Sequence, residues 1–367
     1  MMTIGILKET ICGEKRVILL PEDVKVLTQK FLVVIEKDLA IDIGINDSEY
    51  IKFGARVDSL ENVWKSDIVF KYKAPTVHEF KYLTKDTKIC AIFHAEGNKQ
   101  LIDELLRKKC TAYTYEFLET SDGLFPMAYP GGEIAGKMAV MYANYFMQTQ
   151  FGGKGKTLFA VRGASPSKVA IIGYGNVGGA AINLASKLGN DVFVFGSNIN
   201  KLKKFSVLMD ERVKCFESTK ENLERVLPTV DVIIGAILIS SFDTKPLITN
   251  DIIKKLAPGT IVIDVTCGYG EGYIPAITRK TSLINPVYVN DDGILFCKID
   301  NLPSAYPITT TQAYSKNASS WIYKIAMHAL GIEYSYEVEK AKIVENGKIL
   351  HDVIRQHWEY YEKNNNV

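Results

Sequence analysis

The stretch Lys168-Val-Ala-Ile-Ile-Gly-Tyr-Gly-Asn-Val-Gly-Gly179 decides how this chain folds. A short apolar run leads into Gly173, Gly175 and Gly178, which have the spacing Gly-x-Gly-x-x-Gly. This pattern is typical of a strand that turns sharply into a helix whose N-terminus receives a pyrophosphate. Gly173 makes the turn, Gly175 lets the backbone approach the ligand, and Gly178 lets the helix pack closely on the strand.

The next predicted strand, 191–195, lacks the acid that usually ends it and that binds the ribose of NAD. It ends on Gly196, Ser197 and Asn198, and Lys201 follows. A carboxylate here would repel the 2′-phosphate of NADP, so its absence favours NADP(H), with hydrogen bonds from Ser197 and Asn198 and charge from Lys201. The alternative is that NAD(H) binds without the acid and that the lysines form a solvated helix face.

A second glycine-rich segment, 152–157, is not assigned to the cofactor site. It ends in Gly-Lys-Thr, but the first glycine of a phosphate loop would fall at Gln150 and no strand precedes it. We interpret it as a flexible connection. The predicted cofactor-binding residues are Gly173, Gly175, Asn176, Val177, Gly178, Gly196, Ser197, Asn198, Lys201, Ala236 and Leu238.

Length and composition indicate a globular protein of two domains. The chain has 367 residues, of which 47% are hydrophobic and 23% charged, enough apolar material for two cores. A net charge of +2 gives no argument for nucleic acid or an anionic membrane as a partner. No stretch reaches the ~18–20 apolar residues of a membrane span. The N-terminus lacks signal-peptide regions and the cysteines are dispersed, so we expect a cytoplasmic protein without a metal site.

Strands and helices alternate twice along the chain, which is typical of parallel α/β sheets. The first alternation predicts strands at 3–8, 31–36, 68–73, 89–94 and 112–117 and helices at 21–30, 47–54 and 99–109. The second predicts strands at 168–172, 191–195, 231–236, 260–265 and 294–299.

Two long predicted helices, 133–150 and 309–331, flank the second alternation and suggest an inserted domain. We therefore expect an α/β fold of two Rossmann-like, doubly wound parallel-sheet domains linked by long helices, with the active site in the cleft. Residues 1–130 plus 302–367 would form a discontinuous substrate domain, and residues 131–301 the dinucleotide-binding domain.

Several further islands of sequence occur in a fixed order over some 300 residues. They are Gly5-Ile-Leu-Lys-Glu9, Lys15-Arg16-Val17, Val69-Phe-Lys-Tyr-Lys-Ala-Pro75, Ile92-Phe-His94, Glu133-Ile-Ala-Gly136, Asp231-Val-Ile-Ile-Gly-Ala-Ile-Leu238, Gly259-Thr-Ile-Val-Ile-Asp264 and Asn301-Leu-Pro303. With the glycine fingerprint, they make the chain resemble the alanine dehydrogenase and nicotinamide nucleotide transhydrogenase family over nearly its full length.

The resemblance implies roles for four residues. Arg16 matches the arginine that holds the carboxylate of a 2-oxo acid, which suits its bidentate guanidinium. Lys73 matches the lysine that contacts the substrate's carbonyl or carboxylate, and Asn301 falls in a substrate-binding motif. His94 matches the histidine that exchanges a proton during hydride transfer. Histidine titrates near neutrality, and His94 follows a predicted strand at the sheet edge where such sites gather.

Two positions depart from the family pattern. The second acid after the strand-end Asp264 is replaced by Gly268, with only Glu271 and Asp292 nearby in the sequence to substitute for it. The family's phosphate-binding serine before Glu133 is Gly132. The loss of the acid could widen the substrate pocket for a larger amine or amino acid side chain.

The leading hypothesis is an NAD(P)-dependent oxidoreductase that interconverts an L-amino acid with a 2-oxo acid and ammonia. The alternative is an enzyme similar to carboxyethylornithine synthase or saccharopine dehydrogenase, in which a 2-oxo acid condenses reductively with an amino acid. The segment Gly13–Pro21 and the end of the 191–195 strand resemble that group. A third hypothesis is a nucleotide-binding homologue without dehydrogenase activity. The resemblance also implies a homo-oligomer.

Overall fold

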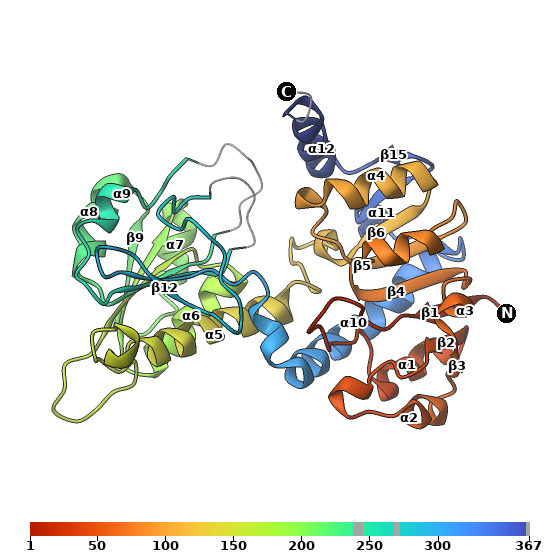
Figure 1. The fold of residues 1–367 in the computed structure, drawn as a ribbon, viewed down its shortest axis with the longest axis horizontal. Coiled ribbons are helices and arrows are strands. Elements are labelled where there is room, and N and C mark those ends of the chain that lie inside the picture. Colours follow the sequence, from red (N-terminus) through yellow and green to blue (C-terminus); the bar gives the residue numbers. More distant parts are fainter. Residues whose placement is uncertain (238–244, 267–271, 365–367) are drawn as a thin grey trace. The chain divides into compact units, whose positions relative to one another are not determined.

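The computed structural model describes residues 1–237, 245–266 and 272–364, and the chain forms two compact units. Unit 1 comprises Met1–Gly131 and Tyr306–Val367, and unit 2 comprises Gly132–Ala305. The two ends of the chain therefore share one unit, as the red and blue ribbons of Figure 1 show. The chain leaves unit 1 in the first turn of α5 (Tyr129–Phe146) and returns just before α10 (Pro307–Ala329).

Unit 1 is built on an eight-stranded sheet in the order β15-β14-β6-β5-β4-β1-β2-β3. The run from β6 to β3 is parallel throughout, whereas β14 and β15 are joined to it as an antiparallel pair. The strands are β1 (Thr3–Ile6), β2 (Leu32–Glu36), β3 (Arg56–Asp58), β4 (Ile68–Lys73), β5 (Lys88–Ile92), β6 (Thr111–Thr114), β14 (Lys342–Glu345) and β15 (Lys348–Ile349). The α-helices besides α10 are α1 (Pro21–Thr28), α2 (Asp47–Lys52), α3 (Leu60–Val63), α4 (Lys99–Lys108), α11 (Tyr336–Lys340) and α12 (Asp352–Asn364).

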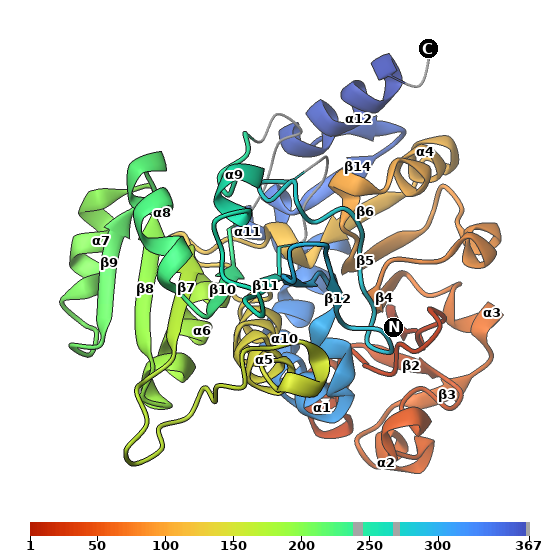
Figure 2. The ribbon, with the colours of Figure 1, turned by 60° about the vertical axis from the view of Figure 1, so that its left-hand side comes forward.

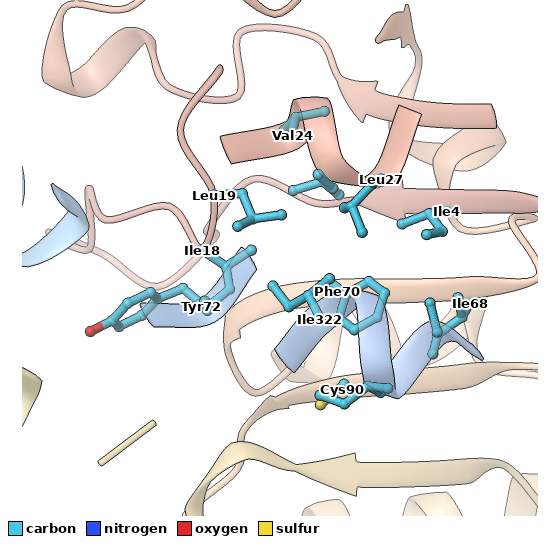
Figure 3. Close-up of a cluster of buried hydrophobic side chains, with 14 of the residues drawn as sticks. Ile4, Ile18, Leu19, Val24, Leu27, Ile68, Phe70, Tyr72, Cys90 and Ile322 are labelled. Atoms are coloured by element: carbon cyan, nitrogen blue, oxygen red, sulfur yellow. The ribbon is translucent and has the colours of Figure 1, made fainter. Parts of the chain in front are cut away.

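Helices α1 and α10 cover one face of the parallel strands (Figure 3). Pro21 occupies the first turn of α1, where its missing N–H leaves no hydrogen bond unmade. Leu27 lies one turn from Val24, so both side chains pack toward the sheet, where they join Phe70 of β4 and Ile322 of α10. This apolar layer supports the strands whose C-terminal ends carry the polar residues described below.

Unit 2 is built on a seven-stranded sheet in the order β12-β13-β11-β10-β7-β8-β9, parallel except for β12 (Figure 2). Apolar side chains form a core on each of its faces, as a doubly wound fold requires. The strands are β7 (Lys168–Ile172), β8 (Asp191–Gly196), β9 (Val213–Glu217), β10 (Val232–Gly235), β11 (Ile261–Asp264), β12 (Tyr288–Val289) and β13 (Leu295–Cys297). The helices besides α5 are α6 (Asn176–Lys187), α7 (Ile199–Ser206), α8 (Lys220–Val226) and α9 (Asn250–Ile253).

The predicted α/β class is confirmed, but five short strands were not predicted. Four of them, β3, β9, β12 and β15, are edge strands of the two sheets, and β14 lies next to an edge. Edge strands are commonly short and charged, so their sequences carry little alternation of apolar and polar residues. In the segments that the structure describes, no helix has both the length and the apolar character that a membrane span needs.

The strand boundaries nearest the predicted site were wrong by two or three residues. The expected strands 89–94 and 112–117 end at Ile92 and Thr114. The residues that follow enter two short 3-10 segments, Ala95–Gly97 and Tyr115–Phe117. His94 therefore lies in a connecting loop just beyond its strand.

Candidate functional site

Three ionisable side chains meet at the C-terminal ends of neighbouring parallel strands in unit 1. Lys73 is the last residue of β4, His94 follows β5, and Glu116 follows β6. Lys73 Nζ lies 2.8 Å from His94 Nε2, and His94 Nδ1 lies 2.9 Å from Glu116 Oε1. Ligand sites of open α/β sheets gather at this edge of the strands.

The chemistry of the two neighbours assigns the protons on His94. Burial alone would raise the pKa of Glu116, but His94, Thr114 and Lys73 outweigh burial and lower it to about 2. A carboxylate can only accept, so His94 Nδ1 donates to Glu116. A lysine ammonium can only donate, so His94 Nε2 accepts from Lys73. Nε2 is therefore the nitrogen that can exchange a proton, and the positive charge that His94 carries with this proton bound is what lowers the pKa of Glu116.

Glu116 also fixes the backbone that carries His94. Its carboxylate accepts hydrogen bonds from Phe93 N at 2.8 Å and from His94 N at 3.1 Å, and Thr114 Oγ1 donates to it at 2.6 Å. His94 adopts a left-handed conformation with φ +44°, which residues other than glycine rarely occupy. Glu116 was not among the predicted site residues, because the expected strand 112–117 placed it inside the sheet. Its position beyond the strand that neighbours β5 is the signal that could have found it.

A β-bulge in β4 helps to direct Lys73 toward the site. Phe70 pairs with Cys90 and Lys73 pairs with Ile92, so β4 holds one residue more than β5 between these pairs. Bulges of this kind redirect side chains beside functional sites. The extra residue falls at Lys71 or Tyr72, which are both fully buried.

Arg16 is also buried, and its guanidinium is held from two sides. Glu14 accepts from Arg16 Nε at 2.6 Å and also from its Nη2, and Arg16 Nη1 donates to Tyr72 Oη at 3.1 Å. The guanidinium carbon lies 4.4 Å from the centroid of the Tyr72 ring. Burial alone would lower the pKa of Arg16, but Glu14 raises it above its usual value, so the group is a permanent cation.

A network of buried charges surrounds Lys71 of β4. Lys71 Nζ donates to Glu79 Oε1 at 2.9 Å and to Lys8 O at 3.0 Å, and it lies 3.8 Å from Glu9 Oε2. Glu9 Oε1 accepts from the backbone N–H groups of Tyr72 and Lys73. Burial raises the pKa of Glu9 to about 7, although Lys71 opposes the shift. Glu9 thereby ties the loop after β1 to the end of β4.

Replacing Glu116 with glutamine is expected to shift the pH–rate profile of the protein's reaction to lower pH by about 1–3 units. Glutamine keeps a side-chain oxygen that can accept hydrogen bonds from the backbone N–H groups of Phe93 and His94. It loses the negative charge that stabilises protonated His94. Initial rates measured from pH 5 to pH 10 test this. Glu119→Gln, whose carboxylate lies 3.9 Å from Lys340, serves as the control and should leave the profile in place. A profile that does not move in Glu116→Gln would contradict the assigned role.

The glycine fingerprint of unit 2 has the geometry that a pyrophosphate needs. An ideal Cβ on Gly173 would lie within 2.9 Å of the carbonyl of Ala236, and Gly173 has φ +102°. A Cβ on Gly178 would lie within 2.7 Å of the carbonyl of Gly173. At Gly175 nothing lies within 4 Å of such a Cβ, so the space at the start of α6 is open. The residues present therefore fit a dinucleotide phosphate at this helix N-terminus.

Two glycines of α5 let it pack on this part of α6. A Cβ on Gly136 would lie within 3.0 Å of the carbonyl of Val177, so any side chain there would push the helices apart. A Cβ on Gly132 would lie 3.1 Å from Asn176 Cβ. The position of the family's phosphate-binding serine therefore borders the first residue of α6, even though glycine occupies it here.

Among the remaining predicted cofactor residues, Gly196 ends β8, Ser197 and Asn198 follow it, Lys201 lies in the first turn of α7, and Ala236 follows β10 with its carbonyl beside Gly173. Gly196 is buried, whereas Ser197, Asn198 and Lys201 are exposed. The Asn198 side chain caps α7 by accepting a hydrogen bond from Lys201 N at 3.0 Å. Of the expected cofactor residues, Leu238 lies outside the described part of the chain, as do Gly268 and Glu271.

Unit 2 also carries Asn301 and an ion pair that was not predicted. Asn301 precedes a 3-10 turn, and its carbonyl accepts from Ser304 Oγ at 2.8 Å. Lys298 Nζ lies 2.8 Å from Asp264 Oδ2 at the end of β11, and Tyr273 donates to Asp264 Oδ1. Asp292 lies on an exposed turn. Within residues 1–237, 245–266 and 272–364, no group of three or more His, Cys, Asp or Glu is placed to hold a metal ion.

Two family models match most of the chain. The description "Alanine dehydrogenase/PNT, N-terminal domain" matches residues 5–135, and "Alanine dehydrogenase/PNT, C-terminal domain" matches residues 139–352. The alanine dehydrogenase of Staphylococcus saprophyticus is 31% identical over 327 residues, which are 89% of this chain and 88% of that protein. The alanine dehydrogenase of Mycolicibacterium smegmatis is 28% identical over 328 residues, again 89% and 88%.

Solved structures agree with these sequence matches. An L-alanine dehydrogenase structure superposes with a TM-score of 0.88 at 29% identity, covering 98% of this chain and 99% of that one. A transhydrogenase from Sinorhizobium meliloti superposes with a TM-score of 0.77 at 22% identity, covering 95% and 99%, and shows a shared fold.

Proposed function

This chain belongs to the alanine dehydrogenase/PNT family, and we propose that it interconverts an L-amino acid with a 2-oxo acid and ammonia, using a nicotinamide nucleotide. The observation that carries the proposal is the contact chain Lys73–His94–Glu116. It provides a proton-exchanging imidazole with a cation at one nitrogen and an anion at the other. Such an arrangement suits proton transfer to or from a reacting carbonyl or amine.

Each unit-1 residue has a separate task in the proposed reaction. Arg16 binds the carboxylate of the substrate, for which a fixed guanidinium is well shaped. When His94 Nε2 takes up a proton it becomes a donor, and Lys73 must then turn to another acceptor. A substrate carbonyl oxygen can accept hydrogen bonds from both protonated His94 and Lys73. Glu116 stabilises the imidazolium that forms.

The hydride must come from, or go to, a cofactor. A bound nicotinamide nucleotide supplies or accepts a hydride at the α-carbon of the substrate. Gly173, Gly175 and Gly178 would hold its pyrophosphate at the start of α6. In reductive amination the 2-oxo acid and ammonia form an imine with loss of water, and the hydride and a proton then complete the amino acid.

We propose further that the cofactor is NADP(H) rather than NAD(H). Position 196 carries no carboxylate, so nothing there repels a 2′-phosphate. Lys201 lies exposed in the first turn of α7, close in the chain to Ser197 and Asn198.

Titration of nucleotide fluorescence is expected to show tighter binding of NADPH than of NADH. Lys201→Ala should weaken NADPH binding by about tenfold, because a charge-assisted contact to a phosphate is lost, and should leave NADH binding unchanged. Lys204→Ala, an exposed lysine farther along the same helix, is the matched control. Equal affinities for the two nucleotides in the parent protein would contradict the NADP(H) proposal.

The reaction itself is tested by following cofactor oxidation with a panel of substrates. We expect turnover when ammonium is supplied with pyruvate or another 2-oxo acid. Turnover only with pyruvate plus lysine or ornithine would instead indicate reductive condensation of two carbon skeletons. Inertness toward the whole panel would contradict a dehydrogenase function altogether.

Three finer expectations from the sequence are part of the proposal. Unit 1 would be the substrate domain and unit 2 the dinucleotide-binding domain. Self-association into a homo-oligomer is supported by the family resemblance alone. A cytoplasmic location is supported by the dispersed cysteines, which form no Cys-x-x-Cys pair.

A further inference from the structure

The ring of Tyr174 stands over the end of β8 in unit 2. Tyr174 is the residue between the first two glycines of the fingerprint, 22 positions before Gly196 in the sequence. An ideal Cβ on Gly196 would lie within 2.8 Å of two ring atoms of Tyr174, Cδ1 and Cε1. Real Cβ atoms essentially never approach other atoms so closely. Gly196 is accordingly buried, although the next residue, Ser197, is exposed.

Two contacts hold the Tyr174 ring in this place. Its hydroxyl donates to the carbonyl oxygen of Asn198 at 3.3 Å. Its face packs against Phe205 of α7, with 5.3 Å between the ring centroids and an interplanar angle of 42°. The atoms that a side chain at position 196 would strike lie in the body of the ring, not at its free end. A side chain at position 196 would therefore disturb a ring that both contacts hold in place.

Position 196 is the position that the ribose-binding acid would occupy in an NAD site. The Tyr174 ring therefore occupies the space that an aspartate or glutamate side chain at position 196 would need. A neutral ring brings no anion to this subsite, so it does not repel a 2′-phosphate. The missing acid at position 196 and the aromatic residue at position 174 are thus two parts of one arrangement.

We propose that Tyr174 is a specificity-determining residue of the adenosine-ribose subsite, where its ring excludes a carboxylate from position 196 and forms the wall that faces the ribose. The inference rests on the proposed nucleotide site in unit 2. Positions 174 and 196 are interdependent in this arrangement. Restoring the acid alone cannot create an NAD site while the ring remains.

Four variants test this interdependence: Gly196→Ala, Gly196→Asp, Tyr174→Ala and the double variant Tyr174→Ala/Gly196→Asp. Gly196→Ala adds only a methyl group and separates the steric effect from the charge. The readouts are the Tm of each protein without ligand and the dissociation constants for NADH and NADPH by fluorescence titration. Tyr174→Phe keeps the ring, removes the hydroxyl and serves as the control for the bond to Asn198.

We expect Gly196→Ala and Gly196→Asp each to lower Tm by about 2–4 °C or more, since a kilocalorie of strain has that effect in a domain of this size. Gly196→Asp should bind both nucleotides more weakly than the parent. In the double variant the loss of Tm should be smaller than the sum of the single losses. Its NADH affinity should exceed that of Gly196→Asp by at least about tenfold, because the new carboxylate now has room to reach the ribose.

Two results would overturn the proposal. One is an unchanged Tm in Gly196→Ala together with a gain in NADH affinity in Gly196→Asp alone. The other is strict additivity of the two single changes in both Tm and NADH affinity. Failure of the proposed nucleotide site gives a different result: the parent protein binds neither nucleotide, while the ligand-free Tm values still report whether Tyr174 and Gly196 are coupled.

Discussion

Replacing His94 with alanine is expected to lower kcat about 10²- to 10⁴-fold, the usual contribution of a positioned general acid or base. Alanine removes the imidazole whose Nε2 faces Lys73 and whose Nδ1 faces Glu116. Initial rates at saturating substrate measure the loss.

The same variant should keep its affinity for the nucleotide. His94 belongs to unit 1, whereas the glycine fingerprint belongs to unit 2, so the pyrophosphate cradle is untouched. His78→Ala is the matched control, because this histidine is exposed on the 3-10 helix Val77–Tyr82 and should be dispensable. Equal losses of kcat and of nucleotide affinity in His94→Ala would contradict a role confined to the substrate.

Replacing Lys71 with methionine is expected to lower the free energy of unfolding by about 3–5 kcal/mol, the usual cost of breaking a buried ion pair. Lys71 is fully buried between two carboxylates, those of Glu79 and Glu9. Methionine fills a similar volume, but it leaves Glu79 without its cation. Urea unfolding followed by circular dichroism measures the change.

Lys8→Met provides a matched control for this substitution. Lys8 forms an ion pair with Asp42 at 3.0 Å, but both side chains are partly exposed. Exposed pairs contribute about 0–1 kcal/mol, so this variant should unfold almost as the parent does. Similar losses of unfolding free energy in the two variants would contradict this expectation, because they would show that the burial of Lys71 adds nothing to the cost of losing its ion pair.

The sequence was sufficient to predict those features that local patterns encode. The run Val169–Ile172 and the glycines after it predict a strand, a tight turn and a helix, because only glycine fits at Gly173 and Gly178. Five strands of unit 1 were predicted for a similar reason, since β4 begins with the apolar run Ile68–Phe70 and residues 89–92 of β5 are apolar. Lys73 and His94 could be placed at strand ends for the same reason.

The features that were missed depend on contacts between distant parts of the chain. Glu116 belongs to the site because β6 lies beside β5 in the sheet, and its own sequence shows only an acid near the end of a strand. In the sequence, Lys71 alternates with apolar neighbours and so looks like an exposed residue of a strand. Its burial becomes clear only from the bulge in β4 and from its partners Glu9 and Glu79. The reason that position 196 excludes a side chain lies in Tyr174, which no local pattern connects with it.

The proposed reaction transfers a hydride to the α-carbon of a 2-oxo acid skeleton and gives an amino acid. It is tested most directly by supplying reduced nicotinamide nucleotide labelled with deuterium at C4, together with pyruvate and ammonium, and by analysing the product by mass spectrometry. We predict alanine that carries one deuterium at C2, and none in the reaction of His94→Ala over the same time. Alanine without the label, or label found only in a 2-hydroxy acid, would contradict the account.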